Sequence, residues 1–215
     1  MSLEIWKNRY SVKQFSTQDD FEEEINYLKQ VIEYIPIQQG INSHFWLLLS
    51  NKNKKDKEFK LFLFKHVFAL ADGSEHMYPV LSAPYVFLSV MNKEYNEHQC
   101  ISNVGVHAGV LLAEALRLNL DVSTLNCKDM LTKSSNSKFL IKQFDRYIKD
   151  QLITKLKKYK KETSNPKFTT SPGIAVCIGK GLPLEQNMVK VIDNKRVKVG
   201  QKKKKNFSNI ETLDD

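Results

Sequence analysis

The sequence has few of the residues that mark fibrous or disordered chains. Its 215 residues include only 8 Gly and 6 Pro, far fewer than collagen-like or low-complexity chains contain. Hydrophobic residues make up 41% and aromatic residues 10%, which is enough for a packed core and excludes a disordered chain. The length fits one medium domain and no linker divides the chain, so we predict a single domain over residues 1–215.

Long apolar runs are also absent. A membrane-spanning helix needs roughly 18 consecutive apolar residues. The longest apolar stretches are Ala83–Met91, which is too short, and Val104–Leu120, which contains Glu114 and Arg117. The N-terminus has no apolar segment of the kind found in secretory signals. We therefore expect neither a membrane span nor a secretory signal.

Cysteine is scarce, and histidine shows no pattern. Cys100, Cys127 and Cys177 lie far apart and fit no Cys-x-x-Cys spacing. Three buried thiols in a reducing compartment are the expected state, which favours a cytoplasmic location. The five His residues have no metal-ligand spacing, so we expect no bound metal.

Motifs that bring their own catalytic side chains are missing. The chain has no G-x-S-x-G, no H-E-x-x-H and no P-loop, and no carboxylate pair stands out. If the protein is an enzyme, a cofactor would carry the chemistry, and we predict no catalytic side chain.

The chain is strongly basic. Its net charge is +9 and its pI is about 9.3. Basic residues gather in Lys155–Lys161 and in Lys195–Lys205, the second of which contains no acidic residue. This charge favours polyanions or phosphorylated ligands as partners, and it fits nucleic acid and a small phosphate ester equally well.

Helical and strand patterns alternate along the chain. Apolar spacings of three and four predict a helix that begins at Asp19, with Glu22 at capping-box distance. The same spacing predicts three further helices, at Phe59–Leu70, Asn103–Leu118 and Phe139–Tyr159. Short apolar runs predict strands at Phe45–Leu49, Pro84–Met91 and Gly173–Gly179. The chain is therefore expected to be α+β or α/β, with a tail, residues 181–215, too polar to form its own core.

A short segment near the N-terminus carries phosphate-binding chemistry. Alternate residues of an extended segment share one face, so Arg9, Ser11 and Lys13 would point the same way. A guanidinium, a hydroxyl and an ammonium together suit a phosphate group. A solvated basic strand is the plainer interpretation of the same residues.

Two other segments carry polar groups of interest. Asn42, Ser43 and His44 lie in a predicted loop before a strand, where they could hydrogen-bond a polar ring system or form an ordinary loop. Near the C-terminus, Lys202–Lys205 is followed by Phe207 and Ile210. Such a run is commonly a flexible basic tail, but the apolar residues give it a means of docking.

Taken in order, these segments resemble the nitroreductase family of FMN-dependent NAD(P)H oxidoreductases. The resemblance runs from Arg9 to Ile210 and is clearest at RYSVKQF, NSHFW, NVGVHAGVLLAEALRLNL and IGKGLP. It implies an α+β three-layer sandwich, a mainly antiparallel sheet flanked by helices. It also implies an intertwined homodimer with FMN at the interface, NADH or NADPH as co-substrate, and a C-terminal extension, residues 181–215, that wraps the partner subunit.

The resemblance also implies roles for particular residues. Arg9 and Ser11 would hold the FMN phosphate, Lys13 would approach the flavin ring, and Tyr10 belongs to the same segment. In the family a loop Asn lies near the flavin and basic residues near the C-terminus close the phosphate site. The residues of this chain that match are Asn42, Lys203 and Lys205.

The chain departs from the family pattern around the flavin ring. His44 and Phe45 stand where the family has Gln and Pro, and we assign both to the substrate pocket. Gln39 and Gly40 stand where small hydroxyl residues are usual. These changes affect the substrate side more than the phosphate side.

Three functions are compatible with the sequence. The first is an FMN-dependent oxidoreductase that transfers hydride from NAD(P)H through FMN to a nitroaromatic, a quinone or a similar small acceptor. The second is an FMN-binding relative with a specialised or lost reductase activity. The third is a basic nucleic-acid-binding protein without enzyme activity, although no recognised nucleic-acid motif is present.

Overall fold

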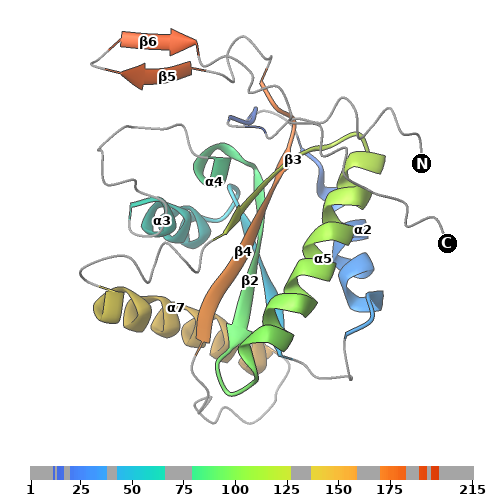
Figure 1. The fold of residues 1–215 in the computed structure, drawn as a ribbon, viewed down its shortest axis with the longest axis vertical. Coiled ribbons are helices and arrows are strands. Elements are labelled where there is room, and N and C mark those ends of the chain that lie inside the picture. Colours follow the sequence, from blue (N-terminus) through green and yellow to red (C-terminus); the bar gives the residue numbers. More distant parts are fainter. Residues whose placement is uncertain are drawn as a thin grey trace, which may run out of the picture.

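An antiparallel sheet of four strands forms the middle of the molecule, in a computed structural model (Figure 1). The structure describes residues 12, 14–16, 20–37, 43–65, 79–126, 137–158, 170–182, 189–192 and 195–198. The strand order is β1-β2-β4-β3, and every neighbouring pair is antiparallel. The strands are β1 (His44–Ser50), β2 (Tyr85–Asn92), β3 (Asp121–Asn126) and β4 (Thr170–Gly179).

The central strand β2 is buried on both faces, as its uninterrupted apolar sequence requires. Side chains of a strand alternate between faces, so Val86, Leu88 and Val90 enter one core. Tyr85 and Phe87 enter a second core on the opposite face. Two helical layers are therefore needed to cover the sheet.

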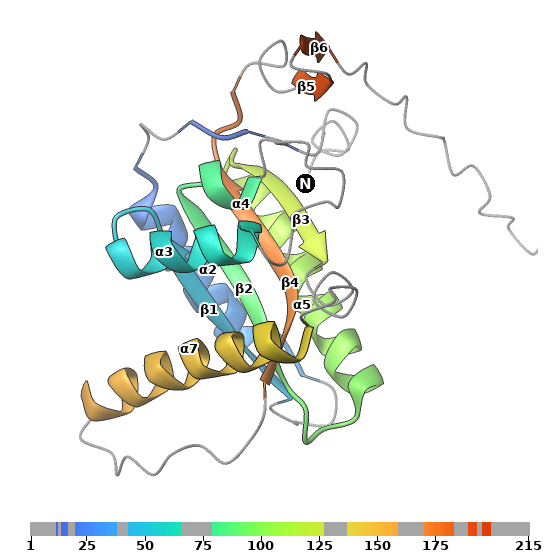
Figure 2. The same ribbon diagram turned by 90° about the vertical axis from the view of Figure 1, so that its left-hand side faces the viewer.

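The helices supply these layers (Figures 1 and 2). On one face lie α2 (Glu22–Tyr34) and α5 (Glu97–Arg117). The other face is covered by α3 (Lys54–Leu63), α4 (Pro79–Ser82) and α7 (Ser137–Lys158). This arrangement confirms the predicted α+β three-layer sandwich with a mainly antiparallel sheet.

A bulge interrupts the pairing of β2 with β4 between Leu88 and Val90. The hydroxyl of Ser89 accepts a hydrogen bond from Ile174 N at 2.6 Å and donates to Ile174 O at 3.1 Å. Ser89 therefore satisfies the backbone groups that the bulge leaves unpaired, which explains a buried Ser in an otherwise apolar strand.

The long elements were predicted correctly, but several of their starts were wrong. Helix α2 begins at Glu22, and its N-cap is Phe21, which makes no side-chain cap, so the predicted start was wrong. Asp19 lies outside the described residues. Asp20 accepts hydrogen bonds from Lys52 and Tyr85, which ties this segment to the turn after β1.

Two helices begin earlier than predicted because an Asn caps each of them. Asn53 accepts a hydrogen bond from Lys55 N, so α3 includes charged residues that were assigned to a turn. Asn96 accepts one from His98 N, so α5 begins six residues before the predicted Asn103.

The strands also differ from expectation. β3 was not predicted, and β4 begins three residues earlier than the predicted Gly173. The polar tail contains a hairpin of β5 (Val189–Ile192) and β6 (Lys195–Lys198). Asn119 takes the left-handed conformation expected of a helix cap, with φ of 58°.

Within the described part of the chain, no helix has the length and apolar character that a bilayer crossing requires.

The close contact between Gly179 and Pro84 gives a test of the packing at one end of the sheet. A Cβ on Gly179 would lie 2.6 Å from Pro84 Cδ, so Gly179→Ala should destabilise the fold by about 1–3 kcal/mol. Urea unfolding measures this change. In the double variant with Pro84→Ala, the loss of unfolding free energy should be smaller than the sum of the two single losses. A loss equal to that sum would contradict the contact.

Candidate functional site

All seven residues expected to bind FMN lie outside the described residues. These are Arg9, Tyr10, Ser11, Lys13, Asn42, Lys203 and Lys205. Their sequence neighbours Val12, Gln14 and Ser43 are described, so the structure fixes where the N-terminal segment and the loop before β1 meet the fold. The side chains of Lys155–Lys161 and Lys195–Lys205 also lie outside the described set.

The N-terminal segment is anchored beside the end of β4. Phe15 forms a β-bridge with Gly181, and Phe15 N donates to Ser82 Oγ at 3.1 Å. Leu182 N donates to Gln14 O at 3.0 Å. Val12 and Phe15 are buried in the core that α3, α4 and α7 cover. The N-terminal segment and the start of the C-terminal tail therefore lie together at one end of the sheet.

The loop before β1 is anchored at the opposite end. Ser43 O accepts hydrogen bonds from Asn92 N at 2.9 Å and from the Cys100 thiol at 3.5 Å. The Asn103 side chain donates to Ser43 Oγ at 3.3 Å. The end of β2 and the first turns of α5 thus hold this loop.

The two anchored segments are far apart within one chain. Residue Ser50 of β1 pairs with Tyr85, next to Pro84, and His44 pairs with Met91. Six residue steps of a strand, at roughly 3.3 Å each, separate the two ends by about 20 Å. Within one subunit the described anchors of the N-terminal segment, Gln14 and Phe15, therefore lie at the opposite end of the sheet from Ser43.

His44 forms a buried cluster with Trp46 and His107 of α5. The Trp46 indole donates to His107 Nδ1 at 3.1 Å, which places the His107 proton on Nε2. His44 Nε2 lies 3.4 Å from the same Nδ1. His44 Nδ1 and His107 Nε2 are buried without a hydrogen-bond partner among the described residues. The sequence analysis found no signal that pairs these two histidines, which are 63 positions apart.

Burial keeps both imidazoles neutral. Desolvation, with the nearby His107 as a second cause, lowers the pKa of His44 from 6.5 to about 4. Desolvation also lowers the pKa of His107. Two charged imidazoles in contact would repel one another, so the cluster is more stable at neutral pH than in acid.

Phe45 lies on the other face of β1. It packs against the core that contains Phe59 and Phe144, because neighbouring strand residues point to opposite faces. The structure therefore does not bring the His44 and Phe45 side chains together.

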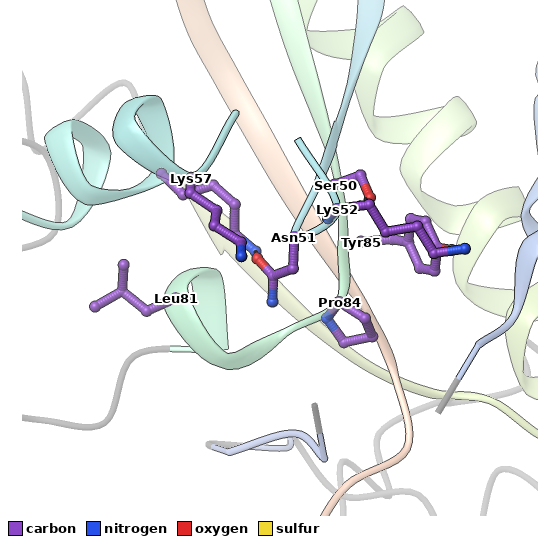
Figure 3. A pocket seen from close by; sticks show the side chains of 8 residues that line it. Ser50, Asn51, Lys52, Lys57, Leu81, Pro84 and Tyr85 are labelled. Carbon is purple, nitrogen blue, oxygen red and sulfur yellow. Dashed lines mark hydrogen bonds between the residues drawn. The ribbon is translucent and has the colours of Figure 1, made fainter. Parts of the chain in front are cut away.

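A cavity of about 430 Å³ opens at the end of the sheet where β1 ends and β2 begins (Figure 3). Its lining includes the buried residue Lys60 of α3, which the sequence analysis did not single out because it lies within an apolar helical pattern. The full lining is Ser50, Asn51, Lys52, Lys57, Lys60, Leu81, Pro84 and Tyr85.

The cysteines and the acidic residues offer no metal site within the described ranges. No group of three His, Cys, Asp or Glu residues there could hold a metal ion. Cys100 and Cys177 are buried free thiols, as predicted, and burial raises the pKa of Cys177 to about 12. Cys127 lies outside the described part of the chain.

Known structures with a similar fold include nitroreductases, some of them FMN-dependent or with bound FMN. An FMN-dependent nitroreductase from Clostridium difficile R20291 superposes with a TM-score of 0.55 at 15% identity, covering 84% of this chain and 87% of its own. The chain has the nitroreductase fold. A nitroreductase with bound FMN from Bacteroides fragilis NCTC 9343 gives 0.55 at 13% identity and covers 93% of this chain and 95% of its own.

The same fold occurs in an enzyme with another acceptor. An enone reductase of gut-bacterial fatty acid saturation metabolism gives a TM-score of 0.51 at 13% identity, covering 84% of this chain and 88% of its own. By sequence alone, no family model and no curated protein matches the chain.

The buried histidines predict a loss of stability in acid. A group whose pKa is lowered by folding contributes stability above its unfolded pKa, and that stability is lost as the pH falls. For His44 the loss should develop from about pH 6.5 to pH 4 and reach up to about 3 kcal/mol. Urea unfolding at a series of pH values measures it.

Variants separate the cluster from other acid effects. His44→Gln should flatten the pH dependence in this window, whereas His98→Gln, at an exposed position of α5, should leave it unchanged. An identical pH profile in wild type and His44→Gln would contradict the assignment.

Proposed function

We propose that the protein is an FMN-dependent oxidoreductase that passes hydride from NADH or NADPH through FMN to a nitroaromatic, a quinone or a similar acceptor. The nitroreductase fold over most of the chain carries this proposal. Bound FMN supplies the chemistry, because it accepts a hydride and then releases electrons to the acceptor.

The anchoring of the N-terminal segment supports FMN binding at one end of the sheet. Arg9 and Ser11 would hold the phosphate, Lys13 the flavin ring, and Lys203 and Lys205 would close the phosphate site. The hydrogen bond from Leu182 to Gln14 holds the beginning of the C-terminal tail beside the N-terminal segment. The N-terminal segment and the tail thus start from the same end of the sheet, which supports the proposal that cations from both surround one dianionic phosphate.

The separation of the two ends supports a site shared between two subunits. The described neighbours of Lys13 and Asn42, which are Gln14 and Ser43, lie at ends of the sheet about 20 Å apart. A Lys and an Asn so far apart could not both hydrogen-bond one flavin ring. We therefore propose a homodimer in which Asn42 comes from the partner subunit.

The outer face of α5 suits such a dimer. Ile101 and Val106 are 47% and 51% exposed, although both are large and apolar. A Cβ at Gly105 or Gly109 would meet nothing within 4 Å, so a partner helix could approach the backbone closely. The proposed interface would cover this face.

The substrate side remains with His44 and Phe45 in this proposal. They begin β1 directly after the loop that would reach the partner's flavin. Because their side chains point to opposite faces of the strand, only one of them could contact a given acceptor. His44 is held by His107 and Trp46, unlike a residue free to move in an open pocket. That observation favours the second candidate function, an FMN-binding relative with a specialised or lost reductase activity. Purified protein that contains flavin but does not oxidise NAD(P)H would support this second function.

Replacing Arg9 tests the phosphate role. A charge-assisted hydrogen bond contributes about 1.5–3 kcal/mol, so Arg9→Ala should weaken FMN binding roughly ten- to a hundredfold. FMN titration of the apoprotein, followed by flavin fluorescence, measures the affinity. Lys29→Ala, which removes an exposed cation of α2, should bind FMN as wild type does. Unchanged affinity in Arg9→Ala would refute the phosphate role.

Co-expression tests the shared site. Arg9→Ala and Asn42→Ala chains should each make protein with weak FMN binding. In a mixed dimer, one site would contain both mutations and the other neither, so co-purified mixed dimers should recover tight binding in half of their sites. If each site lay within one chain, no intact site would form, and mixing would restore nothing.

A further inference from the structure

Lys60 is a buried cation on α3. It is 1% exposed, and its ammonium donates to Asn51 Oδ1 at 2.6 Å and to Ala83 O at 2.5 Å. An ammonium has three donors, so these two neutral acceptors leave one N–H. Among the described residues, no carboxylate lies within ion-pair distance of Lys60. A buried charge without a counter-ion is costly, which makes a negatively charged ligand favourable here.

Other donors border the same cavity. The exposed Lys57 lies one turn before Lys60 on α3, and its side chain extends toward Asn51 (Figure 3). Because Asn51 Oδ1 accepts from Lys60, the Asn51 amide nitrogen remains a donor on this side. Two ammonium groups and one amide thus converge at this side of the cavity.

The two sides of the cavity differ in charge. Lys52 is paired with Asp20 at 2.7 Å and with Glu22 at 3.1 Å, and the Tyr85 hydroxyl donates to Asp20. That side is therefore neutralised. Lys57 and Lys60 form no ion pair with a carboxylate of the described residues, and the apolar residues Leu81 and Pro84 also line the cavity.

We propose that this cavity binds a small organic oxyanion. Its phosphate or carboxylate group would accept hydrogen bonds from Lys60, Lys57 and the Asn51 amide, and its apolar part would lie against Leu81 and Pro84. A cavity of about 430 Å³ has room for a ligand of this kind beyond the oxyanion group itself. The site is distinct from the residues proposed to bind FMN.

The state of Lys60 agrees with this geometry. Burial lowers the pKa of Lys60 to about 8, and the adjacent Lys57 adds to this effect. The nearby Cys177 of β4 and Asp56 of α3 oppose it. A bound anion would add a close counter-charge to the more distant one of Asp56.

Calorimetric titration of the FMN-saturated protein tests the proposal. The probes are inorganic phosphate, phenyl phosphate and benzoate, each at constant ionic strength with chloride as the background anion. We expect saturable binding, with phenyl phosphate at least fivefold tighter than inorganic phosphate because the ring contacts Leu81 and Pro84. Benzoate distinguishes a carboxylate ligand from a phosphate ligand, since it offers the same apolar part.

Three variants locate the binding. Lys57→Gln, at an exposed position, should weaken it at least fivefold, and Lys60→Met should abolish it. Lys29→Gln makes the same charge change as Lys57→Gln on α2 and should have no effect. Equal weakening by Lys29→Gln and Lys57→Gln would show only a general charge effect and would overturn the proposal.

Arg9→Ala separates this site from the proposed flavin site. It should leave phenyl phosphate binding unchanged, and Lys57→Gln should leave FMN content unchanged. If Arg9→Ala abolishes phenyl phosphate binding and Lys57→Gln does not weaken it, the anion binds at the flavin phosphate site and the proposal is wrong. If the wild-type protein binds none of the three probes, the proposal is also wrong, and the proposed binding of FMN is unaffected.

Discussion

The burial of β2 on both faces is the constraint on which the rest of the structure depends. Seven of its eight residues are buried, so the strand needs a sheet neighbour on each edge and a helical layer on each face. Each fully buried large apolar side chain contributes about 1.5–3 kcal/mol relative to exposure. The three-layer sandwich meets both requirements.

The same constraint determines where chemistry can take place. Because both faces of β2 are filled, no ligand can reach its middle, and the polar groups are displaced to the two ends of the sheet. One end holds the N-terminal segment, the start of the tail and the cavity with Lys60. The other holds Ser43 and the His44–His107–Trp46 cluster. A site that needs both ends needs two subunits.

The sequence predicted the apolar elements well and the polar boundaries poorly. Continuous or periodic apolar residues identified β1, β2, α5 and α7, because burial decides those positions. The starts of α3 and α5 depend on single hydrogen bonds from Asn53 and Asn96, and an apolar pattern does not contain them. β3 is short and mixes exposed with buried residues, so its pairing with β4 decides its conformation.

In the candidate site too, the sequence predicted some features and could not predict those that depend on tertiary packing. The order of RYSVKQF, NSHFW, the helix NVGVHAGVLLAEALRLNL and IGKGLP predicted the fold through a resemblance. The contact of His44 with His107 and the buried cation Lys60 depend on tertiary packing between distant segments, and neither leaves a local pattern.

FMN dependence is the central claim, and the visible absorbance spectrum of the purified protein tests it most directly. The account predicts a yellow protein whose released chromophore is FMN, in an amount equal to the protein chains. A colourless protein that also takes up no added FMN would contradict the account, although the chain would keep its fold.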